Sequence, residues 1–248
     1  MDAEKGRIMI NFENIIFEGK RRYYIEDLTQ RDYSLENTTP HIFEIMGNCI
    51  EEQAWGELLR ATTMTLLEYF PDYKERLYSF RCQWSKAAMF KSEEGTNYKL
   101  VANNLYINCN HTALHSCWFL QDLLDFFEID KSQVKLIIHR SPAAEPKEVK
   151  DYVEKKFKKD FISFLELSYG KDIEYANKVL DKIDKYLNPR LVKISKSYTS
   201  FFLFDDTTTF SNYAKKVKEI INQEFYMNEK ALKALNKYMK YLTEFYKI

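Results

Sequence analysis

Glycine, proline and cysteine are scarce in this sequence of 248 residues, which has 6 Gly, 5 Pro and 4 Cys. So little Gly and Pro argues against a loop-rich β-sandwich and against Gly-rich phosphate-binding loops. The cysteines are Cys49, Cys82, Cys109 and Cys117, and no two of them form a CxxC pair. We therefore expect reduced thiols and a cytoplasmic protein.

Long apolar runs and nucleotide-binding motifs are also missing. No window approaches 18 consecutive apolar residues, so no transmembrane helix and no membrane partner are expected. The first 15 residues, MDAEKGRIMINFENI, lack the basic and apolar regions of a secretion signal. P-loop, GxGxxG and GxSxG motifs are absent as well. We expect no cofactor.

What the chain does have is apolar and aromatic side chains and an uneven distribution of charge. Hydrophobic residues make up 45% and aromatic residues 16%, enough for a sizeable core. Residues 1–130 carry 13 Lys and Arg against 21 Asp and Glu, whereas residues 131–248 carry 24 against 16. Either the two halves attract each other, or the basic half meets an acidic partner, which is a protein or a nucleic acid.

The first 140 residues mix strand and helix patterns. The patterns predict a hairpin over 8–28 that turns at 18–20, followed by irregular or short elements over 31–52. A helix is predicted over 55–70 and one or two strands over 98–110. A second helix over 111–128 and a strand over 134–140 complete this part. Residues 1–140 are therefore expected to form a compact α+β module.

Beyond residue 140 the pattern becomes mainly helical. SPAAEP, residues 141–146, is the best linker candidate, because it has two prolines in six residues. Next come a helix up to Gly170, a helix over 173–187 ending at Asn188-Pro189, strand character over 190–206 and helices over 211–225 and 228–247. The predicted fold class is α+β, with a mainly helical, basic region over 147–248.

The most suggestive stretch for chemistry is YINCNHTALHSCWFL, residues 106–120. His111 and His115 can share a helix face, but Cys117 points away from it and Cys109 precedes the helix. These four residues cannot all bind one zinc ion, and the HExxH motif is absent because Thr112 follows the first histidine. The start of a buried helix is the favoured reading, and a two-histidine metal site and a Cys–His catalytic pair stay open.

Other candidate residues are fewer. Asp205 and Asp206 after FFLF resemble metal-binding carboxylates at the end of a strand, or else they cap a helix. Lys155, Lys156, Lys158 and Lys159 interleave with Phe157 and form the candidate contact for nucleic acid or an acidic partner. The alternative is an ordinary solvated face. Lys230, Lys233, Lys237 and Lys240 form a second stripe with the same two readings.

Residues 8–140 resemble an accessory α+β module of bacterial restriction-related, anti-phage defence and mobile-element proteins. The resemblance is carried by AWGELLRATTMTLLEYFP, with Trp55 and Pro71, and by NLYINCNHTALHSCWFLQDLLDFFEID, with Asn110 and Asp130. It implies a part attached to, or encoded beside, a catalytic protein. It assigns no catalytic residue to this chain.

Three functions follow from these observations. The favoured one is a non-catalytic interaction subunit of a bacterial anti-phage defence-type complex, whose protein partners include a catalytic defence subunit. The second is a DNA-binding regulator or antitoxin-like protein that uses the basic half on phosphates. The third is a metal-dependent nuclease with an unrecognised site at His111 and His115 or at Asp205 and Asp206. No catalytic, cofactor-binding or metal-binding residue is assigned, and the sequence favours a protein that is not an enzyme.

Overall fold

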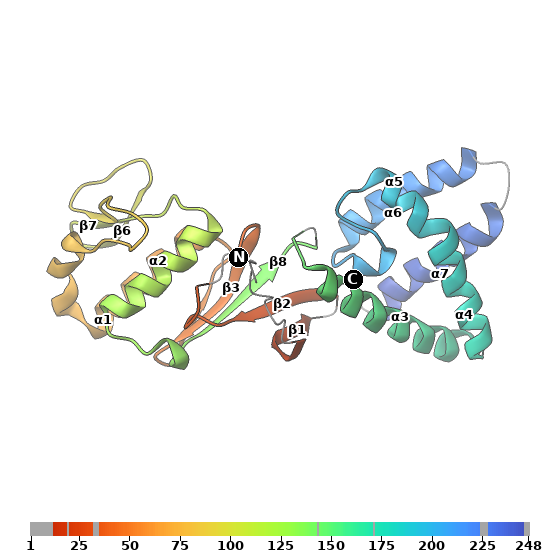
Figure 1. Cartoon of the computed structure of the whole chain (residues 1–248), viewed down its shortest axis with the longest axis horizontal. Coiled ribbons are helices and arrows are strands. Elements are labelled where there is room, and N and C mark those ends of the chain that lie inside the picture. The colour runs from red at the N-terminus through yellow and green to blue at the C-terminus, as the bar shows by residue number, and fades with distance from the viewer. Residues whose placement is uncertain are drawn as a thin grey trace, which may run out of the picture. The chain divides into compact units, whose positions relative to one another are not determined.

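The chain divides into two compact units. The computed structural model describes residues 12–18, 20–31, 35–142, 144–170, 172–223 and 228–245. The α+β unit comprises residues 14–16 and 23–140, and the helical unit comprises residues 1–13, 17–22 and 141–248. Strands lie mostly in the N-terminal part and the C-terminal half is helical (Figure 1), so the fold class is α+β, as predicted.

A five-stranded sheet runs through the N-terminal part. Its strands are β1 (Ile15–Glu18), β2 (Arg21–Glu26), β3 (Thr38–Ile45), β4 (Asn48–Glu51) and β8 (Lys135–Arg140), in the order β1-β2-β8-β3-β4. The strand β8 lies at the centre and is antiparallel to both β2 and β3. Its Leu136 and Ile138 side chains are fully buried, which explains why the last strand of the unit is so apolar. The hairpin predicted over 8–28 is confirmed over 15–26, whereas residues 12–14 form a 3-10 turn, η1 (Phe12–Asn14).

The prediction of irregular or short elements over 31–52 is right only in part, because this segment supplies two paired strands, β3 and β4. The alternation in β3 is hidden by a register shift between Pro40 and Ile42, which changes the face on which later side chains lie. The two strands are joined by Met46 and Gly47, whose φ angles are 50° and 78°. Two consecutive positive φ angles are typical of the tight turns that join antiparallel strands.

Two helices and a small sheet complete the α+β unit. The helices α1 (Trp55–Tyr69) and α2 (Ala113–Phe126) pack on each other, and α1 also contacts β3 and β4. The small sheet has the order β5 (Phe90–Lys91), β7 (Leu105–Asn108), β6 (Tyr98–Ala102). The η2 (Pro71–Tyr73), η3 (Glu75–Ser79) and η4 (Lys131–Gln133) turns link these elements. The helices predicted over 55–70 and 111–128 and the strands predicted over 98–110 are therefore confirmed.

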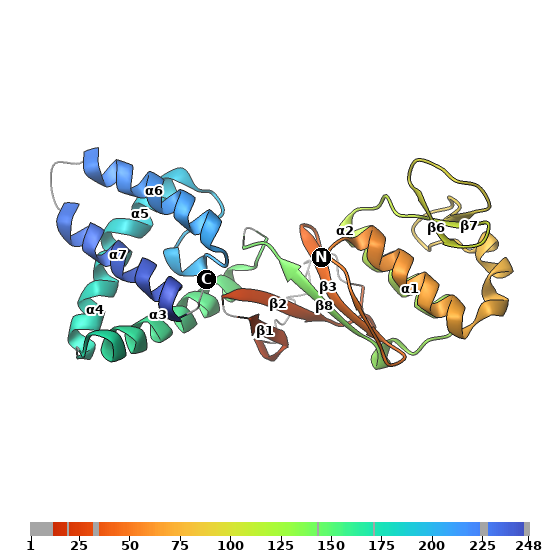
Figure 2. The same cartoon turned by 180° about the vertical axis from the view of Figure 1, so that it is seen from behind.

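The helical unit is built on α3 (Lys147–Tyr169), which ends at Gly170 with a φ of 56°. The remaining elements are α4 (Ile173–Lys182), the π-helical turn η5 (Ile183–Leu187), α5 (Asn188–Ile194), the 3-10 turn η6 (Phe201–Leu203), α6 (Thr207–Gln223) and α7 (Asn228–Phe245). Figure 2 shows α6 and α7 side by side. No helix in the described ranges is long and apolar enough to cross a membrane.

Two predictions for this unit are wrong. The helix over 173–187 does not end at Asn188-Pro189, because the π turn η5 leads directly into α5. Pro189 lies in the first turn of α5, directly after the π turn. The strand character over 190–206 is also wrong, since this stretch forms the rest of α5 and then η6. The run at 201–204 is apolar because all four side chains are buried.

The buried face of α7 differs in part from the one that helical spacing predicts. That spacing puts Leu232, Leu235, Met239, Leu242 and Phe245 on one side; Leu235 and Leu242 are buried, and the side chain of Phe245 lies outside the described residues. Met239 is 40% exposed, while Tyr238 and Tyr241 are fully buried beside Ala231 and Ala234. The face turns toward the tyrosines because their rings pack on Phe161.

The unit boundary after residue 140 coincides with the start of the linker predicted at 141–146. The tip of the first hairpin, residues 17–22, nevertheless belongs to the helical unit. The helical unit therefore includes a segment more than a hundred positions earlier in the chain, which the predicted division at 140–147 did not anticipate.

Candidate functional site

The four candidate lysines of α3 do not form one open basic face. Lys158 makes ion pairs of 2.8 Å with both Glu154 and Asp184. Burial lowers the pKa of Lys158, but the hydrogen bonds to these two carboxylates outweigh that effect and raise it overall. Lys156 pairs with Asp160 at 3.6 Å.

Lys155 and Lys159 are exposed and make no ion pair with a described residue. Two of the four predicted contact lysines are thus available, and the other two are engaged within the unit. The predicted contact with nucleic acid or an acidic partner stays a prediction for this face.

The second predicted stripe, on α7, is also largely engaged. Lys233 and Lys240 form ion pairs with Glu229 and Glu244 along the same helix. The ammonium group of Lys237 lies 3.9 Å from the ring centre of Tyr169, in cation–π geometry. These lysines mainly make contacts within α7 and with the end of α3, so this stripe is not a free basic surface.

The two histidines of residues 106–120 pack on one indole ring. His115 stacks on Trp84, with ring centres 4.4 Å apart and planes at 13°, and His111 meets the same ring edge-on at 5.5 Å. Burial lowers the pKa of His111, so this imidazole resists protonation. Thr112 caps α2 by accepting a hydrogen bond from the backbone N–H of His115. The favoured reading of a buried-helix start is therefore supported by the packing.

The two cysteines of that stretch are not poised for thiolate chemistry. Cys117 is buried in α2, as a small hydrophobic residue would be. The Cys109 thiol donates to the backbone carbonyl of Gly56 at 3.2 Å, and burial raises its pKa to about 11. A thiol with such a pKa remains protonated near neutral pH. Within the described ranges, no three His, Cys, Asp or Glu side chains gather so that they could hold a metal ion.

We predict that the purified protein contains no stoichiometric zinc. The physical reason is that His111 and His115 both pack on Trp84, and the Cys109 thiol donates to a backbone carbonyl. Elemental analysis of protein purified without chelators checks this prediction. About one zinc per chain, lost in a His111→Ala, His115→Ala double variant, would contradict it.

Asp205 and Asp206 have separate roles in the helical unit. Asp206 accepts a hydrogen bond of 2.7 Å from the backbone N–H of Thr209 and so caps α6. Asp205 is buried and lies in the electrostatic environment of Lys20. The capping interpretation is confirmed for Asp206.

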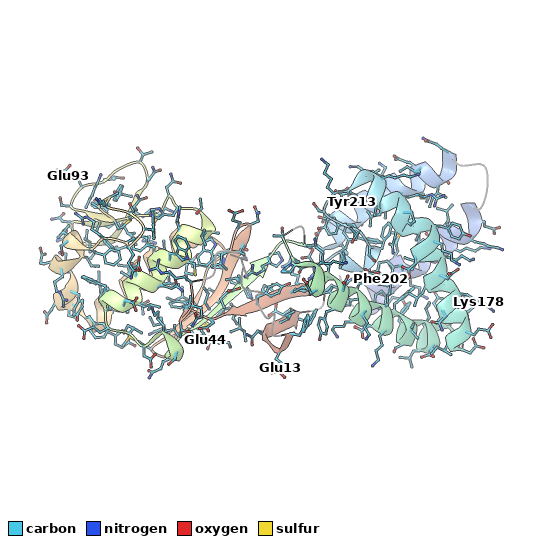
Figure 3. All side chains as sticks on the ribbon, in the orientation of Figure 1. Glu13, Glu44, Glu93, Lys178, Phe202 and Tyr213 are labelled. Carbon is cyan, nitrogen blue, oxygen red and sulfur yellow. The ribbon has the colours of Figure 1, made fainter. Side chains whose placement is uncertain are left out.

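The sequence reasoning missed a buried charged cluster at the tip of the first hairpin. Arg22 donates two hydrogen bonds to the Glu145 carboxylate, of 2.6 and 3.1 Å. It donates a third to the carbonyl of Leu203 at 3.2 Å. Lys20 donates to the Tyr238 hydroxyl at 2.6 Å and to the carbonyl of Phe202 at 3.2 Å. Phe202, labelled in Figure 3, lies inside the unit. This cluster anchors residues 17–22 in the helical unit.

We predict that Lys20 makes stability depend on pH. Burial, followed by the charge of Arg22, lowers the Lys20 pKa well below its ordinary value of 10.5. The unfolded chain then binds more protons at this group than the folded chain does, so stability rises with pH until about 10.5. Wild type should gain stability relative to Lys20→Met between pH 7 and 10 in chemical denaturation. A pH-independent difference would show that Lys20 keeps its ordinary pKa.

An apolar corner is exposed where α3 turns into α4. Leu167 is 80% exposed and Ile173 is 58% exposed, the two highest values among the large apolar side chains of the described residues. Glu166, Asp172 and Glu174 flank this corner. Lys178, which pairs with Glu174, projects from α4 into solvent (Figure 3). We call Leu167 and Ile173 the α3–α4 corner.

Comparisons with known proteins find no counterpart of this chain. No family model, no curated protein and no solved structure matches it.

Proposed function

We propose that the protein is a non-catalytic interaction subunit of a bacterial, anti-phage defence-type complex, and that it works in the cytoplasm. The observation that carries the proposal is the α3–α4 corner, where two large apolar side chains face solvent. Burying both against a partner would be favourable by roughly 1.5–3 kcal/mol per side chain, before the cost of association. The resemblance of residues 8–140 to accessory defence modules supports the biological setting.

The partner that fits this corner is a protein with an apolar anchor and basic residues around it. An apolar anchor matches Leu167 and Ile173, and basic neighbours match the flanking carboxylates. A nucleic acid fits poorly here, because its phosphates would meet Glu166 and Asp172.

The surroundings of the candidate histidine, cysteine and aspartate side chains also support a binding role rather than catalysis. The histidines of α2 pack on an indole, the Cys109 thiol has a raised pKa and Asp205 is buried. A nuclease would need carboxylates or imidazoles converging on one metal ion. These groups therefore favour a binding role over a metal-dependent nuclease.

The test is affinity capture from the native host after nuclease treatment, followed by reconstitution of the complex from purified components. Leu167→Ser, Ile173→Ser is the test variant. Val192→Ser, Met239→Ser is the matched control, because these side chains are also apolar and are 51% and 40% exposed on α5 and α7.

We expect wild type and control to bind one protein in fixed stoichiometry, with the test variant binding at least tenfold more weakly. Equal affinity in all three proteins would show that the corner is not the docking site. If no protein binds wild type in a fixed ratio, the proposed function itself is wrong.

A further inference from the structure

A group of lysines without carboxylate partners lies on α5, on the loop that follows it and on α6. Lys193, Lys196, Lys215, Lys216 and Lys218 are all exposed, and none makes an ion pair with a described residue. On α3 and α7, by contrast, Lys156, Lys158, Lys233 and Lys240 pair with carboxylates of their own unit. The helices α5 and α6 pack on each other, which brings the two groups of lysines onto neighbouring elements.

Carboxylates are scarce in the same region. Residues 188–223, all of them described, carry six Lys and Arg against three Asp and Glu. Asp205 is buried and Asp206 caps α6, so Glu219 is the one exposed carboxylate. The local surface is therefore strongly positive, although the chain as a whole has no net charge.

Two tyrosines are close to these lysines in the chain, Tyr198 two residues after Lys196 and Tyr213 two residues before Lys215. Tyr198 and Tyr213 (labelled in Figure 3) are half-buried, and their ring centres are 5.6 Å apart. Tyr198 stacks on Phe204 at 4.1 Å, which holds its ring in place. The ammonium group of Lys216 lies 5.5 Å from the ring centre of Tyr213. Hydroxyl groups border this area at exposed Thr199, Thr208 and Ser211.

We propose that this surface, defined by Lys193, Lys196, Lys215 and Lys216 with Tyr198 and Tyr213, binds single-stranded nucleic acid. The lysines would neutralise phosphates, and the tyrosine rings would stack on bases. This pairing of cationic groups with aromatic rings is how proteins hold single strands without reading their sequence. The surface is separate from the α3–α4 corner, so either proposal can fail alone.

A single strand is favoured over the other anionic partners. The carboxylates of an acidic protein would pair with the lysines, but they would not stack on the tyrosine rings as bases do. A duplex keeps its bases stacked inside, so the tyrosine rings would gain no stacking contact from it.

The experiment measures binding of the full chain to a labelled 20-nucleotide single strand of mixed sequence over a range of salt concentrations. The duplex of the same length and poly-glutamate of similar charge are the competing probes.

The test variants are Lys193, Lys196, Lys215, Lys216→Ala and Tyr198→Ala, Tyr213→Ala. The control is Lys155, Lys156, Lys158, Lys159→Ala, which removes the same charge from α3. Circular dichroism and thermal melting check that each variant is folded, and Tyr198→Phe, Tyr213→Phe keeps the rings.

We expect wild type, the α3 control and the phenylalanine variant to bind the single strand more tightly than the duplex or poly-glutamate. The four-lysine variant should lose at least tenfold in affinity. Its log–log salt slope should become less negative by about 0.7 for each phosphate no longer neutralised. The tyrosine-to-alanine variant should lose affinity without changing the slope. Equal binding of poly-glutamate would point to an acidic protein instead, and an equal loss in the α3 control would overturn the proposed location.

Discussion

Replacing Arg22 by Met should destabilise the protein by about 3–5 kcal/mol, the usual cost of removing one member of a buried ion pair. Both side chains of the Arg22–Glu145 pair are fully buried, so the Glu145 carboxylate could not replace the lost guanidinium with water. The carbonyl of Leu203 would lose its donor as well. Chemical denaturation followed by circular dichroism measures the change.

The double variant Arg22→Met, Glu145→Met should recover part of this loss, because it removes both buried charges together. Lys178→Met is the matched control. It breaks an exposed pair with Glu174, whose side chains are 69% and 73% exposed, and such pairs contribute little. A loss for Arg22→Met as small as that for Lys178→Met would mean that the hairpin tip is not anchored in the helical unit.

Phe161→Ala should cost about 3–5 kcal/mol, the range for removing a large buried ring. Phe161 is fully buried at the centre of α3, and its ring centre lies 5.3 Å from that of Tyr238 and 5.1 Å from that of Tyr241. Its removal therefore leaves a cavity between α3 and α7. Denaturation under the same conditions gives the change in free energy of unfolding.

Leu167→Ala on the same helix is the control for this substitution. Leu167 is 80% exposed, so its truncation should change stability by less than about 0.5 kcal/mol. If the two variants proved equally stable, the buried and exposed faces of α3 would have been assigned wrongly.

Periodic elements of the fold were predictable, and elements with local irregularities were not. The helix α3 could be predicted because Val149, Val153 and Phe157 recur at helical spacing and Gly170 ends it. The strand β3 was missed because its register shift at Pro40 interrupts the alternation. The join between α4 and α5 was missed because a π turn lets the helix continue up to a proline, which usually signals an end.

The candidate surfaces show a similar limit. Lysine runs are visible in the sequence, but Asp184, which pairs with Lys158 from 26 positions away, is not. The Arg22–Glu145 pair spans 123 positions and leaves no local signal at all. One signal for the α5–α6 surface was available: Lys193 and Lys196 have no Asp or Glu within four positions on either side, whereas Asp151, Glu154 and Asp160 surround the lysines of α3.

The central claim is that the chain works by binding a protein partner. The mass of the assembly that wild type forms in its native host tests this claim most directly. The assembly is captured, treated with nuclease or left untreated, and its native mass and protein composition are measured. We predict that nuclease leaves the chain bound to a partner protein in a fixed ratio. Release of the chain as a free protein of 29.7 kDa after nuclease treatment would contradict the claim, because nucleic acid alone would then hold the assembly together.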